Sequence, residues 1–144
     1  MSARACLILG SVLAGLAVAA GTFGAHGLPA LLEQRHALSQ TATPVDFAKA
    51  IANFETAARY QMYHAIALLF IGLWAERRPA KALRVASAAF VCGSLVFSGF
   101  LYALVLTQQK WLGAIVPIGG VSFLVGWIAT LIAAVKLPSV NPLH

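Results

Sequence analysis

Four long runs of apolar residues alternate along the chain with polar segments, and the first of these polar segments is the longest. The runs cover residues 5–25, 57–74, 84–107 and 112–135. Each is close to the ~20 residues that a helix needs to cross the ~30 Å of bilayer hydrocarbon. Lipid offers the backbone no hydrogen-bonding partner, and no alternating strand pattern is present. The pattern predicts an all-α integral membrane protein, a four-transmembrane-helix antiparallel bundle forming one domain over residues 1–144.

The polar segment between the first two runs contains a helix signal of its own. Thr43, Pro44 and Asp46 supply an N-cap hydroxyl, a proline at the first helical position and an acidic first turn. Apolar residues then recur at helical spacing, at Phe47, Ile51 and Phe54. A straight helix from Pro44 to Trp74 would be about 46 Å long, which exceeds the membrane thickness. We therefore expect an interfacial amphipathic helix over about 44–56 and a bend near Glu55–Arg59.

Composition also indicates a membrane protein. Hydrophobic residues make up 60% of the chain and charged residues 10%, whereas a soluble domain carries about 25% charge. The net charge of +6 is compatible with nucleic acid binding, but the basic residues are few and lie between apolar runs, as membrane-surface charge does. The expected partners are membrane lipids, together with a second copy of the chain or another membrane protein, and no nucleic acid.

The first apolar run has an alternative interpretation as a signal peptide. Residues 1–4 resemble its basic start, and Ala17–Ala19 fits a small-residue cleavage site. The apolar stretch nevertheless continues to Ala25, beyond the roughly 7 to 15 residues of a signal core. We favour a retained helix.

Basic residues predict the orientation. With four spans, six Lys and Arg residues fall on the side of the termini: Arg4, Arg77, Arg78, Lys81, Arg84 and Lys136. Four fall on the other side, two of them in the long loop: Arg35, Lys49, Arg59 and Lys110. The positive-inside rule predicts a multi-pass protein of the cytoplasmic (inner) membrane with both termini in the cytoplasm.

Polar and small residues gather at the non-cytoplasmic end of the predicted spans. FGAHGLP ends the first, RYQMYH opens the second, FSGFLY lies late in the third and VPIGG early in the fourth, and antiparallel neighbours bring these stretches to one end. The candidate polar or ligand layer consists of His26, Tyr60, Gln61, His64, Ser98 and Tyr102. Close helix packing is predicted at Gly21, Gly24, Gly119, Gly120, Ser122 and Gly126.

The sequence contains no recognised catalytic constellation, and we predict no catalytic residue, metal or cofactor. His64 is open to three interpretations: a structural hydrogen bond to a tyrosine or a carbonyl of another helix, a proton or substrate role, or a metal or haem ligand. The structural role is favoured. His26 is expected to cap or anchor the first span, and Cys6 and Cys92 to act as apolar fillers.

The motifs FGAHGL, FETAARYQMYHAIALL, FSGFLYALVLT and WLGAIVPIGGVSFLVGW occur in this order along nearly the whole chain. In this they resemble the small four-span membrane family filed as domain of unknown function 423, which includes YgdD- and YwdK-like bacterial proteins and animal transmembrane protein 256. The resemblance implies the fold and a membrane location, and it implies no activity.

Two main classes of function follow from the sequence, and an enzyme or cofactor carrier is the least favoured third. The favoured one is a non-enzymatic packing, assembly or accessory protein in which the polar layer joins the helices. The alternative is a small carrier, or a binder of lipid or another apolar ligand, that uses this layer. No Asp, Glu, Lys or Arg lies deep in a predicted span, which weakens active transport of charged solutes.

Overall fold

The computed structural model describes residues 1–39 and 44–137, and within these ranges every regular element is helical. The prediction of an all-α protein is confirmed for this part of the chain. The elements are α1 (Ala3–Ser39), α2 (Pro44–Arg77), α3 (Lys81–Gly93), the π-helix η1 (Ser94–Ser98), α4 (Gly99–Thr107), the 3-10 helix η2 (Lys110–Ala114) and α5 (Val116–Val135).

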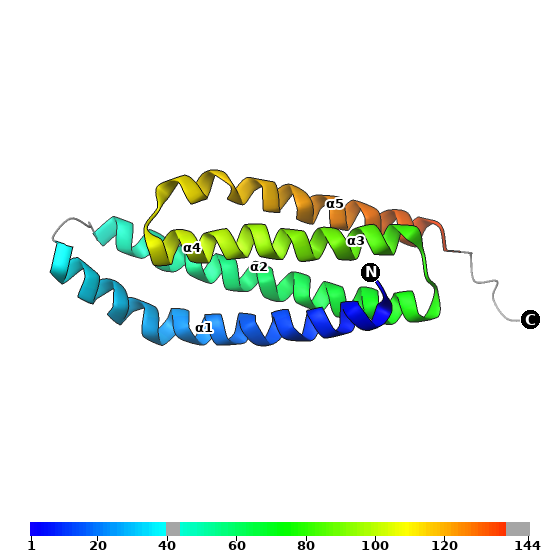
Figure 1. Cartoon of the computed structure of the whole chain (residues 1–144), viewed down its shortest axis with the longest axis horizontal. Coiled ribbons are helices and arrows are strands. Elements are labelled where there is room, and N and C mark those ends of the chain that lie inside the picture. The colour runs from blue at the N-terminus through cyan, green and yellow to red at the C-terminus, as the bar shows by residue number, and fades with distance from the viewer. Residues whose placement is uncertain (40–43, 138–144) are drawn as a thin grey trace, which may run out of the picture.

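The helices lie side by side along one long axis (Figure 1). α1 and α5 lie at opposite edges in this view, and α2 and the continuous rod of α3, η1 and α4 lie between them. α1 packs closely on α2, α5 packs closely on α3, and α2 also contacts α3, η1 and α4. Because α2 lies in this inner position, its side chains can contact α1 on one side and the rod of α3, η1 and α4 on the other.

Three of the predicted spans correspond to helices that are long and apolar enough to cross a membrane. These helical stretches are Ala3–Arg35, Lys81–Thr107 and Lys110–Val135. The run at 57–74 does not appear among them, within the described residues. The reason is that Arg59, Gln61 and His64 lower the mean hydropathy of this part of α2.

The segment between the first two runs differs most from the prediction. α1 does not end near Ala25 but continues through Pro29 to Ser39. Leu28 and Leu32 explain the extension, because both are buried in a cluster with Phe54 of α2 and Val105 of α4. α2 starts at Pro44 with Asp46 in its first turn, as predicted, while the expected cap at Thr43 lies outside the described residues.

A separate helix over 44–56 is not observed. The segment is the first part of one continuous α2 that runs to Arg77, with no break near Glu55–Arg59. Its apolar face is used for packing within the protein: Phe54 is buried, and Phe47 and Ile51 pack against the same cluster as Leu28. The sequence pattern alone places Leu28 and Leu32 in a loop, so it offers no second helical surface for this face to cover.

Exposed apolar side chains divide the surface into two zones. On α2 they recur every three or four residues: Tyr60, Tyr63, Ile66, Phe70 and Leu73. On α1 they end at Phe23, and among residues 24–35 and 46–56, whose side chains the structure describes, no large hydrophobic side chain is exposed. This α1–α2 hairpin extends beyond the turn that joins α4 to α5 (Figure 1). Over 25–35 and 46–56 its exposed side chains are polar or those of alanine.

Candidate functional site

Gln61 connects α2 to α1. Its side chain is buried, and its Nε2 donates a hydrogen bond of 2.9 Å to the carbonyl oxygen of Leu13. Gln61 and Leu68 follow Ala57 by four and eleven residues, spacings that place all three buried side chains on one face of α2. A helix carbonyl has a second lone pair that is free to accept such a bond.

Ser98 connects the rod of α3, η1 and α4 to α2. Its hydroxyl is fully buried and donates to the carbonyl oxygen of Ala57 at 2.9 Å. Ser98 is the last residue of η1, where the backbone follows the wider π-helical pattern. A π-helical turn changes which side chains face a neighbouring helix, so the sequence alone does not fix this contact.

His64 connects α2 to α5 and uses both nitrogens of its ring. Nδ1 lies 2.8 Å from the carbonyl oxygen of Tyr60, one turn earlier in α2, and the indole Nε1 of Trp127 lies 3.2 Å from Nε2. A carbonyl can only accept and an indole N–H can only donate. The imidazole is therefore neutral, with its proton on Nδ1. A tyrosine hydroxyl or a carbonyl of another helix was the expected hydrogen-bond partner of His64. The observed partners are instead the carbonyl of Tyr60 in the same helix and the indole of Trp127.

Aromatic rings surround His64. Its imidazole is parallel to the ring of Phe123, with centroids 3.5 Å apart and an interplanar angle of 6°. The ring centroids of Phe90 in α3 and of Trp127 lie 5.2 Å and 6.1 Å from the centroid of the imidazole, and both rings are tilted relative to it. These contacts cover the faces of the imidazole, while its two nitrogens are occupied. In this arrangement the one lone pair of the neutral ring, on Nε2, is directed at the indole N–H of Trp127.

The remaining members of the predicted layer lie apart from this cluster. Tyr60 is partly exposed and packs on Phe97 with centroids 4.9 Å apart. Tyr102 packs on Phe54 at 4.7 Å, and its buried hydroxyl has no hydrogen-bond partner among the described residues. His26 is exposed on α1. Within the described chain, no side chain of the six hydrogen-bonds to another side chain of the six, so they do not form one network.

The predicted small residues divide into close contacts and open positions. A Cβ on Gly119 would overlap the backbone of Phe97, and one on Gly126 would overlap the ring of Phe90. A Cβ on Gly24 would lie 3.0 Å from Phe54. Gly21, by contrast, has nothing within 4 Å, and Gly120 has only an ordinary contact of 3.9 Å. Ser122 donates to the carbonyl of Ile118 in its own helix at 3.2 Å.

Sequence reasoning missed several residues that position this site. Trp127 was missed, although an indole N–H far from either end of a predicted span needs a buried acceptor, and that requirement was a usable signal. Gly93, which accommodates the ring of Phe123 between α3 and α5, was also missed, and so was Phe90 as the partner of the predicted Gly126. Gly10 accommodates Leu69 and Gly72 accommodates Leu7 in the same way between α1 and α2.

Groups suited to metal binding do not converge in the part of the chain that the structure describes. No three His, Cys, Asp or Glu side chains are placed to hold a metal ion there. Cys6 is buried, Cys92 is exposed, and both are free thiols. The buried polar side chains instead bond mainly to backbone carbonyls of their own or neighbouring helices.

Long apolar helices with buried polar side chains define the class, which is that of a helical membrane protein. The chain belongs to the family described as "Protein of unknown function (DUF423)", whose sequence pattern matches residues 20–120. The resemblance found in the sequence motifs is thereby confirmed.

Curated relatives of the chain are called membrane proteins. The chain is 41% identical over 130 residues to a UPF0382 membrane protein of Staphylococcus aureus (strain bovine RF122), covering 90% of this chain and 94% of the relative. It is 36% identical over 131 residues to the UPF0382 membrane protein YwdK of Bacillus subtilis (strain 168), covering 90% and 95%. None of the solved structures matches this chain.

Proposed function

We propose that the chain is a four-span protein of the cytoplasmic membrane with both termini in the cytoplasm. The exposed apolar row from Tyr60 to Leu73 supports α2 as the fourth span, because such a row is favourable in lipid and costly in water. Residues 57–74 of α2 would extend about 27 Å, close to the thickness of the hydrocarbon. The excess of basic residues at the end of α2 and the start of α3 supports the orientation.

The function that this geometry favours is non-enzymatic packing, assembly or accessory support within the membrane. The observation that carries it is the complete occupation of the His64 ring by Tyr60 and Trp127. Gln61 and Ser98 act in the same way, so α2 is joined to each neighbouring rod by a side-chain hydrogen bond. Such bonds are a recognised means of helix association in lipid. The partners that this role requires are lipids and a second copy or another membrane protein, and nucleic acid has no part in it.

One observation favours the second candidate, a small carrier or binder of an apolar ligand. The hydroxyls of Ser94 and Tyr102 are buried without a hydrogen-bond partner among the described residues. An unsatisfied buried hydroxyl costs about 1–3 kcal/mol. A ligand that offered a hydrogen-bonding group at either hydroxyl would remove this cost.

The two candidates are separated by a comparison of variants. His64→Phe removes the interhelical bond, whereas Tyr102→Phe and Ser94→Ala remove only the unpaired hydroxyls. For a packing protein, His64→Phe lowers the melting temperature of the detergent-solubilised protein, and the two hydroxyl variants keep it or raise it. Native mass spectrometry is the second measurement. A small molecule that co-purifies with the wild type and is lost from Tyr102→Phe or Ser94→Ala at unchanged melting temperature would favour the ligand binder.

A further inference from the structure

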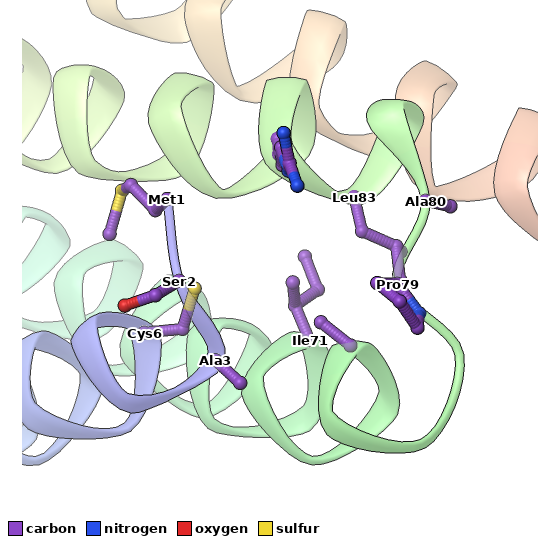
Figure 2. Close-up of a pocket in the computed structure, with 10 residues that line it drawn as sticks. Met1, Ser2, Ala3, Cys6, Ile71, Pro79, Ala80 and Leu83 are labelled. Carbon is purple, nitrogen blue, oxygen red and sulfur yellow. The ribbon is translucent and has the colours of Figure 1, made fainter.

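A cavity lies between the start of α1, the end of α2 and the start of α3 (Figure 2). Its volume is about 90 Å³. Three buried apolar side chains from three helices form its inner wall: Cys6, Ile71 and Leu83. In Figure 2, Met1 and Cys6 face Leu83 and Pro79 across this space. The cavity is therefore apolar inside and lies at one end of the helices, where a membrane surface would be.

The charge around this cavity is strongly positive. Arg84 lines it directly. The neighbouring helix ends and the turn between them carry further basic residues: Arg4, Arg77, Arg78 and Lys81. Three of the four acidic side chains of the chain, Glu33, Asp46 and Glu55, belong to the α1–α2 hairpin at the other end. Only Glu76 counters the basic residues here, so this end attracts anions.

The start of α3 adds donors to this charge. Ala80 at its N-cap provides no side-chain hydrogen bond, and the first turn contains no acidic residue. The first backbone N–H groups of such a helix lack partners within the helix, and its positive dipole end favours an anion. At the start of α1, by contrast, the hydroxyl of Ser2 already accepts from the N–H of Ala5 at 3.2 Å. Ala80 and Leu83 both line the cavity, which places the uncapped end beside it.

We propose that this cavity is a binding site for an anionic phospholipid. The phosphate lies at Arg84 and the start of α3, and the upper part of one acyl chain packs against Cys6, Ile71 and Leu83. The volume admits only a segment of the lipid, so the remainder lies in the surrounding bilayer. Charge alone would attract any anion, but the apolar wall selects one that also carries a hydrocarbon chain. Basic pockets between membrane helices bind acidic headgroups in this way.

Native mass spectrometry of the whole chain, released from nanodiscs of equal parts phosphatidylglycerol and phosphatidylcholine, tests the proposal. The wild type is expected to retain phosphatidylglycerol preferentially. Arg84→Gln is expected to lower that retention about fivefold, the factor that corresponds to about 1 kcal/mol per basic residue near a membrane. The side chain of Arg84 is exposed, so the variant is expected to fold. Lys136→Gln is the matched control, because it removes the same charge outside the cavity lining.

A cavity-filling variant tests the apolar half of the site. Ala75→Phe adds a ring to the lining without a change of charge and is expected to lower phosphatidylglycerol retention. The melting temperature in pure phosphatidylcholine verifies that each variant folds. If Ala75→Phe does not fold, the comparison of Arg84→Gln with Lys136→Gln alone tests the proposed lipid site. Three results each overturn the proposal: no headgroup preference in the wild type, equal losses in Arg84→Gln and Lys136→Gln, or unchanged retention in a folded Ala75→Phe.

Discussion

Trp127 donates its indole N–H to Nε2 of His64 across 3.2 Å, which joins the middle of α5 to α2. Nδ1 of the same ring is bonded at 2.8 Å to the carbonyl of Tyr60, so both nitrogens are engaged by protein groups. If residues 57–74 span the membrane, as we propose, no water is present there to replace either partner. The two buried polar side chains at the opening of the second apolar run, Gln61 and His64, are thus bonded to the neighbouring helices α1 and α5.

Gly119 of α5 lies against the backbone of Phe97, so a larger side chain at this position is expected to destabilise the fold. A Cβ at this position would overlap the backbone nitrogen and Cα of Phe97 in η1, and backbone atoms cannot rotate away. Gly119→Ala is expected to lower the free energy of unfolding by about 1–3 kcal/mol. Denaturation of the purified protein in mixed detergent micelles measures this loss.

Gly21 supplies the control for that variant. It was predicted to pack against another helix, but nothing lies within 4 Å of a Cβ built on it. Gly21→Ala is therefore expected to change the free energy of unfolding by less than about 0.5 kcal/mol. Equal losses at the two positions would contradict the assignment of Gly119 as the point of closest approach.

Arg35 is predicted to tie the α1–α2 hairpin to the end of α4. Its Nη1 donates to the carbonyl of Leu106 at 2.5 Å, and α4 ends at Thr107. A cation at a helix C-terminus contributes about 0.3–1 kcal/mol. Arg35→Gln should therefore increase the rate of amide hydrogen exchange in residues 28–39. Lys49→Gln, which removes an exposed charge from the other arm of the hairpin, should leave that rate unchanged, and the opposite order would show that the contact does not hold the hairpin.

The surface zones predict where α2 meets lipid. Spin labels at positions 66, 70 and 73, in a background that lacks Cys6 and Cys92, are expected to be accessible to oxygen and protected from a water-soluble nickel reagent. Labels at exposed positions 33 and 49 are expected to show the reverse. Accessibility of 66 and 70 to the nickel reagent would mean that α2 does not cross the membrane.

Much of the fold could be predicted from the sequence because lipid imposes a simple rule on the backbone. Apolar runs of sufficient length become helices, and three of the four predicted runs coincide with apolar helices of spanning length. The start of α2 at Pro44 followed from local chemistry, since a proline there needs no backbone donor. The hairpin could not be predicted in the same way. Leu28 and Leu32 become part of a core only when Phe54 lies opposite them.

The site was harder to predict than the fold because its contacts join distant segments. The spacing of Gln61 and His64 placed them near each other on α2, but their partners Leu13 and Trp127 lie 48 and 63 residues away. The π-helical turn of η1 also has no simple sequence signal, although it ends at Ser98 and therefore sets the contact with Ala57. Spacing along one helix identifies which groups share a face, whereas the identity of the partner depends on how the helices pack.

A double-mutant cycle at His64 and Trp127 tests the central claim most directly. His64→Phe keeps a ring against Phe123 but removes both nitrogens, and Trp127→Phe removes the indole donor. The free energy of unfolding of the wild type, both single variants and the double variant is measured under the same detergent conditions. The account predicts a coupling energy of about 0.6 kcal/mol, with an upper value near 1.7 kcal/mol. Strict additivity of the two substitutions would contradict it, because the bond between α2 and α5 would then contribute nothing to holding the helices together.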